Sequence, residues 1–264
     1  MGPHISIKGE IITELFGLPI TNSFITTILV IVVFFFIARF YNSEIQKKDR
    51  SLGFYALHGV LTWLYTMFES VLGKHINTFF TLVGGFFFFI LLMNWSGLIP
   101  GVGSILIAPQ VSHQIEEVHE EEEKDEVAHS NKIPLFRGGT ADLNTTLALA
   151  LISVLGTQLF GFKFLGPINH LKKYFDFRDP IMILLGPLEL VGEVARILSF
   201  AFRLYGNIFA GEVLLSIVPF LLPVFLSFVV SPLFFMEIFV GLVQALVFAM
   251  LSTVFINMAI STHH

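Results

Sequence analysis

The 264-residue sequence contains no cysteine, which excludes disulfide bonds, thiolate metal sites and cysteine nucleophiles. Charged residues make up only 13% of the chain, and the 15 lysines and arginines form no basic stripe of the kind that binds nucleic acid. The sequence also lacks the His-Glu-x-x-His zinc motif, the Gly-x-Ser-x-Gly nucleophile elbow and the Gly-x-x-x-x-Gly-Lys phosphate loop. We therefore expect no cofactor, no metal ion, no nucleic acid and no nucleotide chemistry on this chain.

What the sequence has in abundance is apolar residues. They account for 55% of the chain, include 31 phenylalanines and give a mean hydropathy of +0.80, which is typical of a membrane protein. A helix that crosses a bilayer needs about 20 mostly apolar residues. Segments of this kind lie at 20–40, 78–99 and 143–164, and a longer apolar region runs from 181 to 260. We expect Pro187, Pro219, Pro223 and Pro232 to interrupt that region, with helices at 181–217 and 232–260.

The expected fold is an all-α polytopic membrane protein with about five membrane-embedded helices. Apolar residues at helical spacing between 52 and 72, together with His58 and Glu69, predict an additional amphipathic helix on the membrane surface. The helix at 181–217 would measure roughly 55 Å, against a hydrocarbon core of about 30 Å. It must therefore tilt strongly or kink.

The chain divides into four parts: an outer N-terminal segment (1–19), two spans with a cytoplasmic amphipathic connection (20–100), an acidic outer loop (101–139) and the C-terminal helices (140–264). Short-loop positive charges between 39 and 74 and between 172 and 178 predict a cytoplasmic C-terminus and an outer N-terminus. The loop carries eight acids and one lysine between 116 and 126. We interpret this run as a solvated loop; gathering cations at a membrane entrance is the alternative.

Five polar residues share a stripe about 80° wide on the long helix that follows. They are Glu189, Glu193, Arg196, Arg203 and Asn207. Arg196 has a glutamate one turn away and is expected to form an internal ion pair. Arg203 has Ser199 and Asn207 one turn away on either side and no carboxylate, so the acid that meets it is expected from another subunit. The alternative is an arginine that snorkels to the lipid headgroups.

Arg203 is the most informative residue because a guanidinium does not lose its proton at accessible pH. Its charge costs at least ~2.5–3.5 kcal/mol at the bilayer centre, and such residues mark ion pathways, proton relays or counter-ions.

Two further carboxylates lie in the apolar region. Glu212 faces about 140° away from the stripe, and Glu237 shares a face of the last helix with Gln244. We expect Glu212 and Glu237 to line an aqueous cavity and relay protons; the alternative is that each accepts a local hydrogen bond. Gly241, Ala245 and Ser252 form a small-residue edge that permits close helix approach.

At these residues the chain resembles subunit a of the bacterial rotary F-type ATP synthase. Residues 198–212 are similar to the family's arginine signature, with its Arg-Leu-aromatic-Gly-Asn core, and 244–248 to its glutamine motif. Residues 140–146 and 187–193 are similar to the segments before the middle span and at the entry to the long helix. The match covers roughly residues 93–260.

The resemblance implies a non-catalytic stator subunit in the bacterial plasma membrane, with two long, strongly tilted helices at its C-terminus. It would lie against a ring of c subunits, together with b-type peripheral stalk subunits and the remainder of the F1Fo complex. Arg203 would hold a passing c-subunit carboxylate ionised and block proton leakage between two half-channels. Glu212, Glu237, Asn207 and Gln244 would belong to the outer access path, and Glu189, Glu193 and Arg196 to the opposite exit.

Two departures from the family pattern stand out. Position 237 carries glutamate where some members have histidine, and the acidic run at 116–126 is unusually long and charged. The sequence leaves open the coupling ion, the ring size and the direction of the reaction.

Two other classes of function were weighed. A secondary transporter that binds substrate among Arg203, Glu189 and Glu193 should show an internal inverted repeat. The ionisable residues of the apolar segments instead concentrate in the C-terminal half. An intramembrane hydrolase is disfavoured by the missing catalytic motifs.

Overall fold

The computed structural model describes residues 9–15, 18–99, 102, 105–107, 133–167, 180–221, 228 and 230–261. The long helices are α1 (Asn22–Ile45), α2 (Leu52–Leu72), α3 (Ile76–Ser96), α4 (Leu143–Leu165), α6 (Pro180–Leu221) and α7 (Val230–Ile260). Shorter elements are the 3-10 turns η1 (Gly73–His75) and η3 (Gly139–Ala141) and the strands β1 (Ile11–Leu15), β2 (Leu18–Thr21), β3 (Leu106–Ile107) and β4 (Ile133–Pro134).

The predicted all-α polytopic membrane fold is confirmed. Among the described residues, five stretches are long and apolar enough to cross a membrane, and α2, η1 and α3 together count as one of them (Leu52–Ser96). The expected helix at 52–72 is α2, within the same bounds. The sequence did not predict the two small antiparallel sheets, in which β1 pairs with β2 and β3 pairs with β4. The acidic run at 116–126 and the basic turn at 172–178 lie outside the described residues.

Side-chain caps set where three of the helices begin. The hydroxyl of Thr21 accepts a hydrogen bond from the Phe24 amide, and Ser51 does the same for Phe54, both at 3.3 Å. The carboxylate of Asp142 accepts from the Asn144 amide at 3.0 Å and so caps α4. Each bond satisfies one of the amide groups that the first helical turn leaves without a partner.

The prolines interrupt the apolar region less than expected. α6 continues through Pro187 and past Pro219 to Leu221, so the expected end at residue 217 is wrong. A proline removes one backbone hydrogen bond, but the freed carbonyl of a membrane helix can be satisfied by neighbouring groups and local adjustments. Pro232 lies in the first turn of α7, where its missing N–H costs nothing. Pro223 lies outside the described residues.

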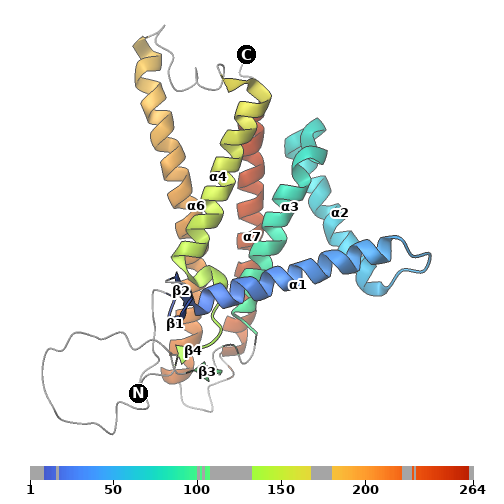
Figure 1. Cartoon of the computed structure of the whole chain (residues 1–264), viewed down its shortest axis with the longest axis vertical. Helices are drawn as coiled ribbons and strands as arrows, with labels where there is room; N and C mark the ends of the chain where they lie inside the picture. The colour runs from blue at the N-terminus through green and yellow to red at the C-terminus, as the bar shows by residue number, and fades with distance from the viewer. Residues whose placement is uncertain are drawn as a thin grey trace, which may run out of the picture.

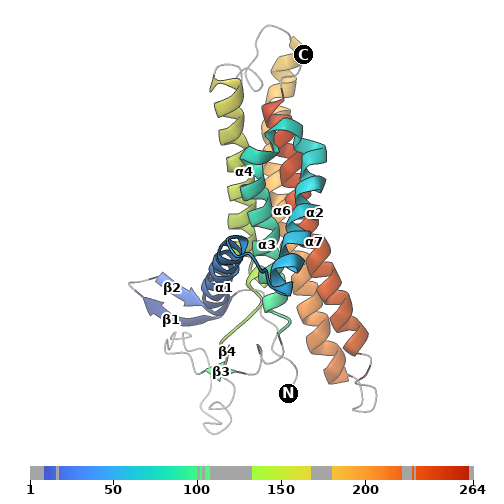
Figure 2. The same ribbon diagram turned by 90° about the vertical axis from the view of Figure 1, so that its right-hand side faces the viewer.

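Helices α3, α4, α6 and α7 run alongside one another, α2 folds back along α3, and α1 runs crosswise at one end of the bundle (Figures 1 and 2). The β1–β2 hairpin lies at that same end, and α7 ends at the opposite one (Figure 1). The shared core is rich in phenylalanine. Phe79 meets Phe160 of α4 edge to face, with ring centroids 4.7 Å apart, and Phe86 of α3 meets Phe248 of α7 at 5.6 Å.

Asn94 of α3, which is buried, connects α3 to α7. The side-chain amide of Asn94 donates to the Gly241 carbonyl at 2.9 Å, and its oxygen accepts from the Thr140 hydroxyl at 2.8 Å. A Cβ at Gly241 would lie 3.2 Å from the Asn94 Cβ, so the absence of a side chain there brings the two backbones together. Further along α7, Ser252 is buried and its hydroxyl meets that of Ser153 at 2.7 Å.

We predict that Asn94→Ala lowers the thermal unfolding temperature of the detergent-solubilised protein. The substitution leaves the Thr140 hydroxyl without its partner and removes the link to α7, with an expected loss of about 1–2 kcal/mol. Asn42→Ala, at an exposed position on α1, is the matched control and should change the transition little. Equal shifts for the two variants would contradict the role assigned to Asn94.

Candidate functional site

The polar stripe of α6 begins with a satisfied ion pair. The Arg196 guanidinium donates to both carboxylate oxygens of Glu193, at 2.8 and 3.0 Å. It also lies over the ring of Phe255 on α7, 3.8 Å from the centroid. Such a position favours a cation electrostatically. Glu189, half-buried, lies one turn before Glu193 on the same helix. The ion pair expected for Arg196 is thus present, and the contact of its guanidinium with Phe255 links α6 to α7.

Arg203 differs from Arg196 in its surroundings. Its recorded polar contact is a 3.3 Å hydrogen bond from Nη2 to the Ser199 hydroxyl, one turn earlier. Within the described part of the chain, no carboxylate forms an ion pair with Arg203. The side chain is half-buried, and its neighbour Phe202 is 55% exposed. The guanidinium therefore lies at the edge between the buried and exposed faces of α6, and no described carboxylate compensates its charge.

One turn beyond Arg203, the stripe crosses to the last helix. The side-chain amide of Asn207 donates to Gln244 Oε1 at 2.8 Å. Asn207 is exposed, whereas Gln244 is buried in α7. The two residues that the sequence assigned to separate motifs are therefore joined into one polar link between α6 and α7.

Glu212 and Glu237 line a common cavity of about 210 Å³, together with residues at the end of α3 and in the segment before η3. Glu237 is only 3% exposed, and the structure records no ion pair for it among the described residues. Its carboxylate lies directly against the backbone of α6. A Cβ built at Gly211 would come within 1.9 Å of Glu237 Oε2. Position 211 must therefore lack a side chain for this carboxylate to occupy its place.

The same cavity contains a residue that the sequence did not single out. Arg137 is 7% exposed, and its Nε and Nη2 atoms contact the Glu212 carboxylate at 3.2 and 3.3 Å. Its backbone amide donates to the Thr26 hydroxyl of α1 at 3.3 Å. Arg137 and Glu212 are 75 residues apart, so no helical periodicity relates them. The one sequence feature that could have pointed to Arg137 as a site residue is its position as a single arginine in an apolar and glycine-rich segment.

The arrangement offers polar side chains along most of α6 and no obvious metal centre. Among the described residues, no group of three or more His, Asp or Glu side chains is placed to hold a metal ion. Arg203 lies ten residues after Glu193 and nine before Glu212, which places it about 14–15 Å along the helix from each. An isolated cation thus separates two groups of acids.

Comparison with known proteins agrees with this geometry. The family model described as ATP synthase A chain matches residues 23–257. The chain belongs to this family. It is 31% identical over 205 residues to "ATP synthase subunit a" of Syntrophobacter fumaroxidans, covering 78% of this chain and 70% of that protein. It is 29% identical to the Legionella pneumophila subunit a over 251 residues, covering 94% and 90%.

A third relative, "ATP synthase subunit a, sodium ion specific" of Propionigenium modestum, is 30% identical over 253 residues, covering 94% of this chain and 77% of that protein. Family membership establishes a multi-pass, ion-translocating subunit of the membrane sector that works within the F-type complex. It is not the subunit that makes or hydrolyses ATP.

We predict that Arg137 and Glu212 are energetically coupled. Arg137→Gln leaves the Glu212 carboxylate beside a cavity without its cation, and should lower the unfolding temperature in detergent. The double variant Arg137→Gln/Glu212→Gln should recover part of that loss, with a coupling energy of about 1 kcal/mol, because both charges are then removed. Strictly additive shifts would show that the pair contributes nothing.

Proposed function

We propose that this subunit is the stator that forms two proton half-channels against a ring of c subunits and couples proton translocation to rotation of that ring. The observation that carries the proposal is Arg203, a half-buried cation on α6 whose recorded partner is a serine hydroxyl rather than a carboxylate. A membrane-embedded guanidinium is expected to meet an acid. The acid is supplied by the c subunits, one at a time, as the ring turns.

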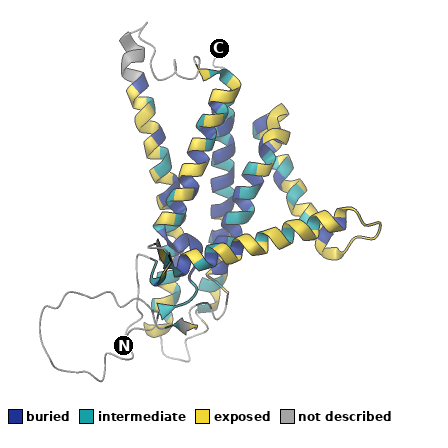
Figure 3. Ribbon diagram, viewed as in Figure 1, coloured by how far each residue is buried: buried dark blue, intermediate teal, exposed yellow. Residues whose placement is uncertain are grey.

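The exposed apolar face of α6, which borders Arg203, supports contact with another apolar protein. Leu188, Val191, Leu198 and Phe202 are exposed on α6 at spacings of three, four or seven residues. In the most apolar stretch of α6, 17% of residues are buried, against 39% in α7. The burial colouring shows the same contrast, with exposed residues along α6 and buried ones along α7 (Figure 3). Such a face is suited to a helical partner within the membrane.

Elementary electrostatics supplies the mechanism. A carboxyl group surrounded by lipid favours the protonated form, whereas a nearby positive charge favours ionisation. A c-subunit carboxyl that approaches Arg203 therefore releases its proton, and it regains one after moving on. If release and uptake occur through separate aqueous routes, a membrane potential worth ~2.3 kcal/mol per charge per 100 mV drives rotation in one direction.

The two routes use the two groups of polar residues. Glu212, Glu237, Asn207 and Gln244 form the outer access path, and Arg137 belongs to the same cavity. Glu189, Glu193 and Arg196 lie toward the opposite exit. In support, the C-terminal end of α6 lies near the β1–β2 hairpin, and the N-terminal end of α6 lies at the same end of the bundle as the C-terminal end of α7 (Figure 1). The N-terminus is then outside, and the C-terminus is cytoplasmic.

The proposed partners are the c-subunit ring, b-type peripheral stalk subunits and the remaining subunits of the complex, in a bacterial plasma membrane. We propose the proton as the coupling ion. ATP-driven acidification of vesicles in sodium-free buffer tests this choice directly. A strict requirement for sodium would overturn it without affecting the stator assignment.

Arg203→Ala is predicted to abolish ATP-driven proton pumping in inverted membrane vesicles while the complex still assembles, because no cation remains to ionise the passing carboxyl. Arg39→Ala, which removes an exposed arginine of α1, is the control and should keep near-normal pumping. Pumping by the Arg203→Ala complex at the wild-type rate would refute the proposal.

Glu237→Gln is predicted to reduce passive proton conduction through membranes stripped of the catalytic sector, because an amide cannot relay a proton. Gly211→Ala should have a similar effect, because its methyl group must displace the Glu237 carboxylate. Gly156→Ala adds the same methyl to α4, where no atom lies within 4 Å, and it should conduct normally. Unchanged conduction in Glu237→Gln would remove this residue from the path.

A further inference from the structure

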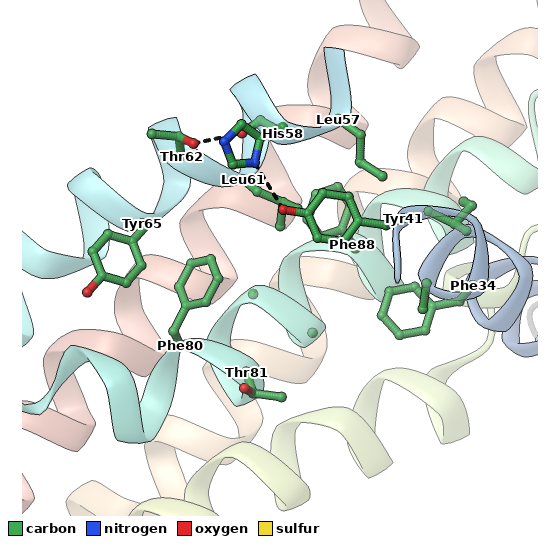
Figure 4. A pocket seen from close by; sticks show the side chains of 14 residues that line it. Phe34, Tyr41, Leu57, His58, Leu61, Thr62, Tyr65, Phe80, Thr81 and Phe88 are labelled. Atoms are coloured by element: carbon green, nitrogen blue, oxygen red, sulfur yellow. Dashed lines mark hydrogen bonds between the residues drawn. The ribbon is translucent and has the colours of Figure 1, made fainter. Parts of the chain in front are cut away.

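A second cavity lies far from the polar stripe, between α1, α2 and α3. It has a volume of about 610 Å³ and an almost wholly apolar lining. Phe34 and Ile37 line it from α1, Leu61 from α2, and Phe80 and Phe88 from α3. Figure 4 labels Phe34, Leu61, Phe80 and Phe88 among the side chains that line it. The volume is within the range of roughly 300–1,000 Å³ that is usual for small-molecule sites.

Two glycines of α3 keep the cavity open. Gly84 and Gly85 both line it, and a Cβ at Gly85 would have no atom within 4 Å. The helix bundle therefore leaves a slot at this position that a single ordinary side chain would begin to fill. In a membrane, such an apolar slot is occupied by hydrocarbon, since water has few polar partners there.

Polar groups occur at one end of the slot. The Tyr41 hydroxyl and His58 Nδ1 are 3.0 Å apart, and both residues line the cavity (Figure 4). Their rings stack on Phe54, at centroid distances of 5.2 Å for Tyr41 and 5.5 Å for His58. The Arg50 guanidinium lies 4.9 Å above the same Phe54 ring. A cation is therefore held one aromatic ring away from the cavity lining.

The loop that carries Arg50 has an excess of positive charge. Glu44 pairs with Lys47 and also accepts a 2.9 Å hydrogen bond from the Ser51 amide, which holds the loop in place. Lys48, Asp49 and Arg50 remain, with one net positive charge, and all three are exposed. Basic residues beside an apolar slot complement an anionic headgroup with its acyl chain.

We propose that this cavity is a binding site for one acyl chain of an anionic phospholipid, whose phosphate lies beside Arg50 and Lys48. The short-loop charge rule places this loop on the cytoplasmic side, where anionic lipid is attracted by basic residues. A membrane helix of another subunit is the competing occupant. Such a helix is about 10–12 Å in diameter, so it would exclude the acyl chain from the slot.

The test is photolabelling of the intact complex in lipid nanodiscs. The probes are phosphatidylglycerol and phosphatidylcholine that carry a photoreactive group near the end of one acyl chain. We expect crosslinks on the cavity-lining residues of α1–α3, with phosphatidylglycerol favoured. Arg50→Gln should lower that preference about fivefold. Gly85→Leu should fill the slot and reduce labelling there to background.

Gly156→Leu is the matched control, because its Cβ position on α4 is equally free and it does not line the cavity. It should leave labelling of the cavity unchanged. Proton pumping by Gly85→Leu should remain normal, which separates this proposal from the stator function. Labelling that is insensitive to Gly85→Leu, or that shows no preference for phosphatidylglycerol, would overturn the proposal. So would crosslinks from the cavity to a helix of another subunit in the intact complex.

Discussion

The positive charge of Arg203 imposes the constraint on which the functional architecture depends. Its guanidinium stays protonated at any accessible pH, so the charge has to be accommodated by position rather than by titration. Arg196, on the same helix, has partners within this chain. Both oxygens of the Glu193 carboxylate accept hydrogen bonds from its guanidinium, which also lies over the Phe255 ring. Arg203, seven residues later and on the same side of the helix, has neither among the residues that the structure describes. The contrast indicates that Arg196 stabilises the helix packing, whereas Arg203 is available to a partner subunit.

Close packing of α6 and α7 makes the outer group of residues a single unit. Gly211 allows the Glu237 carboxylate to lie against the α6 backbone, and Asn207 binds Gln244 one turn further toward Arg203. From α3, Asn94 binds the Gly241 carbonyl, and Trp95 Nε1 donates to the Ile238 carbonyl at 3.1 Å. The helix that carries Glu237 is therefore held by both α3 and α6 at the level of the cavity. A relay needs such positioning, since proton transfer requires groups within hydrogen-bond reach.

Much of this could be predicted from the sequence because hydrophobic periodicity and spacing within one helix are local properties. The bounds of α2 and the Glu193–Arg196 pair follow from the apolar spacing and charges of residues close together in the sequence. Arg137 could not be found that way, since its contact with Glu212 joins a connecting segment to a distant helix. The end of α6 was misplaced because proline is only a local signal of interruption, and a membrane helix can continue where neighbouring groups satisfy the freed carbonyl.

The crosswise direction of α1 bears on how the long helices lie in the bilayer. α1 has 24 residues, or about 36 Å, which is close to the hydrocarbon thickness of about 30 Å. α6 has 42 residues, or roughly 63 Å, about twice that thickness. Because α1 crosses the direction of α6 and α7 (Figures 1 and 2), the two directions cannot both follow the membrane normal. If α1 spans upright, α6 lies strongly tilted, and its exposed face extends sideways through the membrane. A tilted α6 would present Arg203 at mid-depth, with Glu212 and Glu193 displaced laterally as well as vertically. Two access routes can then reach opposite surfaces without meeting.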